Sequence, residues 1–246
     1  MDGMLDAVRG CLKEELRMDV IASNLANANA VGFKQDKISF QELLGEAQSS
    51  GARAKGGRPQ PLDPALIRIK TDQSPGDTRT TGNPLDFAIE GKGFFKVETP
   101  QGIRYTRKGN FSLDVNGYLV TLEGHKVRGT GGPISIQGND VQVDGRGTIK
   151  VDGSQVGQIE VVDLENYDGL MKAGSALFQN DSKTREVSLP SETRVHQGYV
   201  ELSNVNMVDE MVQMIHCMRA FESYQKAIQV LDGLNGRVVN EVSRLR

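Results

Sequence analysis

Helix-breaking residues are confined to the middle of this chain. All eight prolines and 23 of the 28 glycines lie between Gly45 and Gly198. Within a helix, proline costs about 3 kcal/mol and glycine about 1 kcal/mol relative to alanine. The segments 1–44 and 199–246 are therefore open to long helices, whereas the middle favours turns and short strands. Chain ends usually fray unless they pack on something. Two terminal segments with a regular helical pattern therefore predict helices that pack on a partner.

The N-terminal segment carries apolar residues at helical spacing. Steps of three or four residues, with charged side chains between them, predict an amphipathic helix with a narrow apolar stripe. The pattern continues through Leu25 and stops near Gly32, a residue type that commonly ends helices. The stripe consists of Leu5, Val8, Leu12, Leu16 and Val20.

The C-terminal segment carries a longer stripe. It covers 34 residues in ten steps. The mean step of 3.4 residues is nearer to the 3.5 of a heptad repeat than to the 3.6 of a straight α-helix. We expect one helix over 205–246, paired with the N-terminal helix in a coiled-coil-like arrangement, with any leftover stripe facing another subunit. The alternative is a stripe packed on the chain's own β region. The residues of this C-terminal stripe are Met211, Ile215, Met218, Phe221, Tyr224, Ile228, Leu231, Leu234, Val238, Val242 and Leu245.

The middle of the chain predicts a β-rich body. Residues 45–64 are rich in Gly, Ser and Pro and indicate a flexible linker or loop. Short strand-like runs with regular turns follow over 65–198, among them Phe111–Leu113, Ile134–Ile136, Val141–Val143 and Thr148–Val151. Asn116-Gly117 is a strong hairpin signal. The fold class is therefore α+β, in which paired N- and C-terminal helices (1–44 and 199–246) flank a mainly antiparallel β domain, a sandwich or partly open barrel.

Charge and hydropathy exclude several classes of function. The chain has 29 basic and 32 acidic residues and no basic tract, so we expect no nucleic-acid partner. No apolar run approaches the roughly 18 residues of a membrane span, so we expect no membrane insertion. Charged residues from Asp2 to Glu15 interrupt any signal-peptide core. Composition alone therefore favours a cytoplasmic protein.

Motifs for catalysis or for cofactor and metal binding are absent from the sequence. His125, His196 and His216 lack metal-ligand spacing, and the glycine-rich pieces 91–93 and 129–132 lack a phosphate-loop fingerprint. The two cysteines sit one in each terminal helix and are interpreted as buried thiols, with a disulfide as the alternative. A pair of carboxylates that hydrolyses glycosides remains an alternative, although no motif singles out such a pair. We expect no enzyme, no cofactor and no metal.

The boundary of the N-terminal helix carries an unusual polar pattern. Residues 22–34 read ASNLANANAVGFK, with Asn24 and Asn27 on either side of Leu25. Such side chains can bond neighbouring backbone and fix register between helices. The stretch resembles the signature of bacterial flagellar rod and hook proteins, Ala-Asn-Asn-Leu-Ala-Asn followed by Thr-x-Gly-Phe-Lys. Here Ser23 replaces one Asn, and Ala30 stands where Thr is usual.

The resemblance includes both ends and the middle of the chain, and the chain is identified as a member of this family. Residues 131–134 (GGPI), the Met1-Asp2 start and the modest length resemble the proximal-rod (FlgF-like) type, with the distal-rod (FlgG-like) type as the alternative. The other matching stretches are Tyr105–Phe111, Asn116–Val120, Gln197–Asn206, Met214-Ile215, Arg219–Glu222 and Lys226.

The family implies a structural subunit of the flagellar basal-body rod. Its terminal helices would form the inner layer of a tube, and its partners would be copies of itself, other rod proteins and the flagellar type III export apparatus. The resemblance thereby replaces the cytoplasmic location with the periplasm-spanning rod. Alternatives are a cell-wall glycan enzyme and a β-domain module with coiled-coil dimerisation. The candidate assembly residues are Leu5, Val8, Leu12, Leu16, Asn24, Leu25, Asn27, Gly32, Phe33, Asn204, Val205, Met211, Ile215, Met218, Phe221, Ile228 and Leu231.

Overall fold

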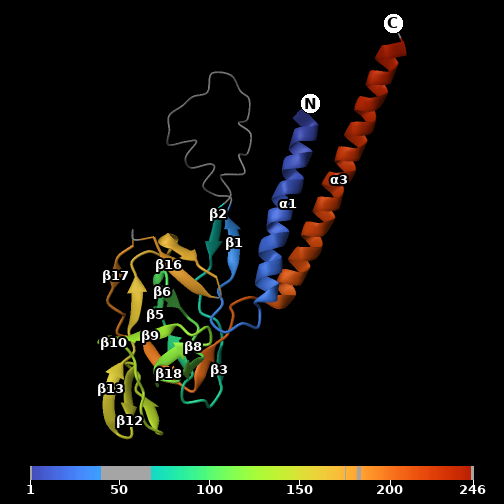
Figure 1. The fold of residues 1–246 in the computed structure, drawn as a ribbon. Helices are drawn as coiled ribbons and strands as arrows, with labels where there is room; N and C mark the ends of the chain where they lie inside the picture. Colours follow the sequence, from blue (N-terminus) through green and yellow to red (C-terminus); the bar gives the residue numbers. More distant parts are fainter. Residues whose placement is uncertain (1, 40–67, 175, 182–183, 245–246) are drawn as a thin grey trace. The chain divides into compact units, whose positions relative to one another are not determined.

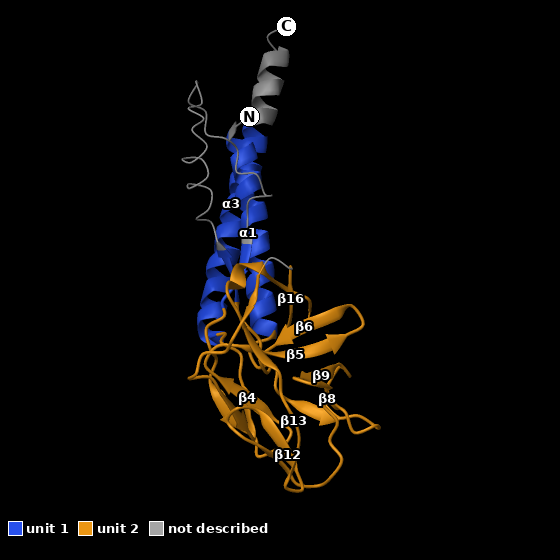
Figure 2. Cartoon of the chain, turned by 90° about the vertical axis from the view of Figure 1, so that its left-hand side faces the viewer, with its two compact units in different colours: residues 1–26, 36–72, 206–246 blue, residues 27–35, 73–205 orange. Residues whose placement is uncertain are grey.

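The computed structural model describes residues 2–39, 68–174, 176–181 and 184–244 (Figure 1). The expected linker at 45–64 lies outside these residues. The chain divides into two compact units, coloured separately in Figure 2. The helical unit comprises Met1–Ala26, Asp36–Asp72 and Asn206–Arg246, and the β unit comprises Asn27–Gln35 and Gln73–Val205. The chain therefore passes between the units four times.

The helical unit contains two long helices and a small hairpin. Helix α1 spans Asp2–Ala26, and helix α3 spans Met207–Arg244. They lie side by side and run in opposite directions (Figure 1). Strands β1 (Asp36–Ser39) and β2 (Arg68–Thr71) pair antiparallel. The expected N- and C-terminal helices are thus present.

The helix ends differ slightly from the expected ones. Helix α1 ends at Ala26, before the expected end near Gly32, because a turn follows in which the Ala30 N–H donates to the Asn27 carbonyl. Helix α3 begins where the Asn206 side chain accepts from the N–H of Val208 at 3.1 Å. Side chains of this type satisfy the open N–H groups of a first helical turn.

The β unit is a set of antiparallel sheets. The main sheet has the strand order β15-β16-β6-β5-β9-β8-β7, with β10 on β9, β14 on β5 and β17 on β14. Strands β11-β12-β13 form a second sheet, and β18 pairs with β4 and β19 with β3. Every recorded strand pair in this unit is antiparallel, which confirms the expected mainly antiparallel domain.

The strands are short, as the turn spacing predicts. Asn116-Gly117 forms the expected hairpin turn between β7 and β8, with Gly117 at a φ of 80°. The expected strand at 134–136 is reduced to one bridge between Ser135 and Tyr118. The bounds are β3 Thr78–Thr80, β4 Phe87–Glu90, β5 Phe94–Thr99, β6 Gly102–Thr106, β7 Phe111–Leu113, β8 Leu119–Thr121, β9 Lys126–Gly129, β10 Gly132–Pro133, β11 Val141–Val143, β12 Thr148–Val151, β13 Ser154–Gln158, β14 Val161–Leu164, η2 Tyr167–Gly169, β15 Leu170–Lys172, β16 Leu177–Asn180, β17 Glu186–Val187, β18 Arg194–Gln197 and β19 Tyr199–Glu201.

The interior of the β unit is apolar. One cluster of buried side chains gathers Phe87, Phe95, Val97 and Phe111 with other aliphatic residues from the surrounding strands. A second cluster gathers around Phe94 and includes Tyr105 and Phe178. Burial of this kind is the dominant stabilising term in folding. The β unit therefore has its own core.

Candidate functional site

The surface between α1 and α3 consists largely of small and polar side chains. A Cβ added at Gly10 would collide with the ring of Tyr224, so the two helices approach closely there. One α1 turn further on, Glu14 is buried against Cys217. Near the start of α1, a Cβ at Gly3 would contact Leu231 at 3.9 Å. The seam is thus unlike the expected apolar stripe.

The Glu14–Cys217 contact is the deepest polar contact along the middle of the pair. The Cys217 thiol donates to the Glu14 carboxylate at 3.0 Å and to the Glu14 carbonyl at 3.1 Å. Burial raises the pKa of the Cys217 thiol to about 12, and the Glu14 hydrogen bond adds to this. Cys217 therefore remains a protonated donor, and both cysteines are free thiols in the structure.

Asn24 links three elements of the helical unit. Its side-chain amide accepts from the Asp36 N–H and donates to the Asp36 carbonyl, both at 2.9 Å. These two hydrogen bonds have the same pattern as those between paired residues of two antiparallel strands. It also lies 3.5 Å from the Glu210 carboxylate in the first turn of α3. Asn24 and Glu210 are almost fully buried. One asparagine therefore joins α1, β1 and α3, consistent with the expected role in fixing register.

Several large apolar side chains of the helices face solvent instead. Leu5 and Leu12 on α1 are each 50% exposed, and Ile215 and Met218 on α3 are 52% and 50% exposed. The expected N-terminal stripe is therefore buried only at its end, at Val20. Of the rest of the stripe, Leu16 is partly buried and Leu5, Val8 and Leu12 are exposed.

A buried ionic cluster anchors the segment 27–35 within the β unit. Lys34, which is fully buried, donates to the Glu201 carboxylate and to the Ser74 carbonyl, both at 2.6 Å. Arg107 donates to the other Glu201 oxygen at 3.2 Å and to the Gly91 carbonyl at 2.7 Å. Buried charges are tolerated only when they are paired and hydrogen-bonded, and here Lys34 and Arg107 are both paired with Glu201.

Backbone contacts complete this anchor. The Gly32 N–H donates to the Glu201 carbonyl at 2.8 Å. Gly32 has a φ of 67°, and a Cβ there would collide with the backbone of Arg107 and Lys108. The Lys172 ammonium lies 4.0 Å from the centre of the buried Phe33 ring. Glycine at position 32 is therefore required both by its backbone conformation and by the space available.

The candidate assembly residues occupy three kinds of position. Leu5, Val8, Leu12, Met211, Ile215 and Met218 are exposed on the helices. Asn24, Gly32 and Phe33 are buried inside the chain's own units, and their contacts are described above. The remaining eight are partly buried: Leu16, Leu25, Asn27, Asn204, Val205, Phe221, Ile228 and Leu231. Of these, Asn204 accepts from the Gln35 N–H at 2.7 Å.

Sequence reasoning missed the charged residues of both clusters. Lys34, Arg107 and Glu201 are members of longer motifs, and Glu14 falls between the apolar positions of the N-terminal helix, so no local pattern singles any of them out. A signal for the helix pair was present, because Glu210, Cys217, Tyr224 and Leu231 recur every seven residues. Nothing in the sequence indicates that Lys34 and Glu201 meet, because they are 167 residues apart.

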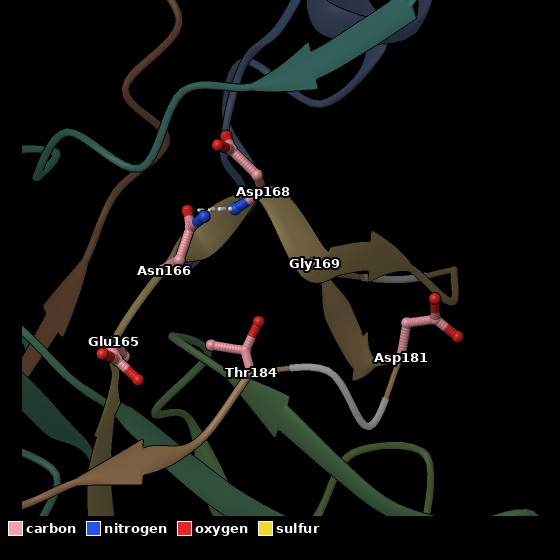
Figure 3. A pocket seen from close by; sticks show the side chains of 6 residues that line it. All are labelled: Glu165, Asn166, Asp168, Gly169, Asp181 and Thr184. Carbon is pink, nitrogen blue, oxygen red and sulfur yellow. Dashed lines mark hydrogen bonds between the residues drawn. The ribbon is translucent and has the colours of Figure 1, made fainter.

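A pocket in the β unit tests the enzyme alternative. It is lined by Glu165, Asn166, Asp168, Gly169, Asp181 and Thr184 (Figure 3). Asn166 accepts from the Asp168 N–H at 2.9 Å and so caps the short η2 turn. A hydrolytic acid needs a carboxyl group held in an apolar setting, whereas the three carboxylates here are exposed. The described residues also contain no group of three or more potential metal ligands.

Three family models match successive parts of the chain. "Flagella basal body rod protein" matches residues 6–34, "Flagellar hook protein FlgE/F/G D1 domain" matches 88–151, and "Flagellar basal body rod FlgEFG protein C-terminal" matches 196–241. A flagellar basal-body rod protein FlgG of Bacillus subtilis is 33% identical over 96% of this chain and 97% of its own length.

The chain belongs to the flagellar basal-body rod protein family. FlgF proteins are also among its relatives: that of Mesorhizobium japonicum is 33% identical over 90% of each chain, and that of Rhizobium meliloti is 31% identical over 94% of this chain and 98% of its own. The family is structural. Each of its three matched segments contributes one member of the buried cluster, namely Lys34, Arg107 and Glu201.

Proposed function

We propose that this chain is a structural subunit of the bacterial flagellar basal-body rod that assembles through the outer faces of α1 and α3. The observation that carries the proposal is the exposure of Leu5, Leu12, Ile215 and Met218 beside a seam filled by other residues. Contiguous exposed apolar side chains are typical of interaction sites. The occupants of these faces are further copies of the chain and other rod proteins.

The same faces account for a filament. Contacts that join different surfaces of successive subunits, without closing into a ring, generate an open helical array. A single chain leaves Met211, Ile215, Met218 and Leu234 of the α3 stripe exposed, and neighbouring helices in a tube would cover them. The coiled-coil-like character of the terminal helices belongs to this assembled state. None of the helices formed by described residues is long and apolar enough to cross a membrane.

We further propose a basal-body location reached through the flagellar type III export apparatus. Relatives named FlgF and FlgG both match the chain. The proximal rod is our first assignment, on the sequence features at 131–134, with the distal rod as the alternative. Assembly requires no chemistry from the subunit.

The test is deletion of the gene in its own bacterium, followed by electron microscopy of purified basal bodies. We expect basal bodies whose rod stops within its proximal part, restored by the wild-type gene. Rods that lack only the distal part would instead support the distal assignment. Intact rods that lack only the hook would contradict a proximal subunit, and normal flagella would overturn the proposed function.

A further inference from the structure

The contacts between α1 and α3 form a ladder with heptad spacing. On α3, positions 210, 217, 224 and 231 each face α1. Two rungs are polar, Asn24–Glu210 and Glu14–Cys217, and all four of these side chains are buried. The two rungs beyond them place a large side chain against a glycine, Tyr224 on Gly10 and Leu231 on Gly3.

This ladder fits one register only. Moving α3 by one heptad would bring Tyr224 to the place of Cys217, opposite the Glu14 side chain. Only a glycine accepts the Tyr224 ring at its present place, because a Cβ at position 10 would overlap it. The Glu14 carboxylate would at the same time lose the thiol donor and keep its neighbour Arg17, 4.0 Å away on α1, and the Glu210 carboxylate would lose the Asn24 amide. Loss of a hydrogen-bond donor from a buried carboxylate is unfavourable.

The ladder also disfavours pairs of identical helices. A parallel α1–α1 pair would bring two Glu14 side chains together, and a parallel α3–α3 pair would do the same with Glu210. A buried polar residue at one seam position of a helix pair is known to specify register and partner at a cost in stability. The apolar faces of α1 and α3 carry no comparable discrimination, because apolar contacts are non-directional.

We propose that the two polar rungs and the Gly10–Tyr224 contact determine that α1 pairs with α3, antiparallel and in this register. The apolar faces then remain available for a second copy of the chain. The inference rests on the proposed function for its purpose, but the pairing itself is a property of the single chain and is measured without assembly.

The experiment uses the full chain with Glu14→Leu and Glu210→Leu combined. Spin labels on non-canonical amino acids at the exposed positions Ala22 and Arg219 report the register as a distance distribution. Sedimentation of the purified protein reports association. We expect one distance and one species for the wild type, and several distances with additional oligomers for the variant.

The matched control is Glu15→Leu with Asp209→Leu, which places the same side chains at neighbouring exposed positions. It should keep the single distance. If association followed surface hydrophobicity alone, the control would associate more than the buried variant, which would overturn the inference. A single unchanged distance in the buried variant, or loss of its helical signal, would overturn it as well.

A conservative pair keeps the two inferences separate. Glu14→Gln with Glu210→Gln retains hydrogen-bond acceptors, so it should keep the wild-type distance, and loss of register here would contradict a hydrogen-bonding role. If gene deletion leaves the rod intact while the distance results hold, the proposed function fails and the pairing rule stands. If the reverse occurs, the rod assignment stands and the pairing rule fails.

Discussion

The two units of the molecule bury their large apolar side chains to different extents. The β unit encloses apolar strands and closes its Lys34–Glu201–Arg107 cluster with its own backbone. The helical unit encloses a thiol, an amide and two carboxylates beside Ala7, Val20 and Ile21, while Leu5, Leu12, Ile215 and Met218 face solvent. The difference supports our proposal that other subunits cover the exposed faces of the helical unit.

The largest expected effect comes from a charge on the outer face of α3, which tests whether this face contacts other subunits. Ile215 is 52% exposed, so Ile215→Asp should change the free energy of unfolding by no more than about 0.5 kcal/mol. Assembly should nevertheless be abolished, because a carboxylate would be buried in the contact with a neighbouring subunit. Swimming and basal-body yield in a complemented deletion strain measure the effect. Arg219→Asp, at an exposed polar position, is the control and should assemble. An Ile215→Asp protein that builds normal rods would remove the outer face from the interface.

The completeness of the β unit is tested by removing the centre of its ionic cluster. Glu201→Ala leaves Lys34 and Arg107 buried without their carboxylate. Breaking a buried ion pair in this way costs about 3–5 kcal/mol. Denaturant unfolding monitored on the β-sheet signal measures the loss. Glu98→Ala, on the exposed side of β5, should cost far less. Equal stability of the two variants would show that the cluster does not hold the β unit together.

The segment 27–35 offers a smaller and more local test. Gly32→Ala places a side chain at positive φ and against the backbone of Arg107–Lys108. The strained backbone costs about 1–2 kcal/mol, and the overlap adds about 1–3 kcal/mol. Gly82→Ala is a matched control, since Gly82 has a φ of 72° but nothing within 4 Å of the added Cβ. The difference between the two variants in unfolding free energy isolates the packing of Gly32. Equal losses would mean that the close approach is relieved by a small shift.

The sequence predicts the elements of both units better than their contacts. Periodicity and the absence of breakers locate α1 and α3, and turn residues locate β7, β11 and β12 to the residue. The choice of seam was not predictable from hydrophobicity, because Gly10 and Cys217 allow an approach that Leu5 and Leu12 do not. The ionic cluster was not predictable from local pattern either. Its three members come from segments far apart in the sequence, and each is ordinary in its own segment.

The smallest expected effect concerns the thiol in the seam. The pKa of Cys217 rises from an ordinary 9.0 to about 12, so the folded helix pair binds this proton more tightly than the unfolded chain does. Its contribution to stability is fully present below pH 9 and is lost as the pH rises towards about 12. Thermal unfolding of the helical signal across this range should therefore show a decline in the wild type. Cys217→Ser keeps a hydroxyl donor to Glu14 without this titration and should flatten the decline, whereas Cys11→Ser should leave it unchanged.

Near neutral pH an alkylating reagent should modify Cys11 before the buried Cys217. Equal alkylation rates would show that the helix pair opens in the free chain, and the seam would then be a feature of the assembled rod.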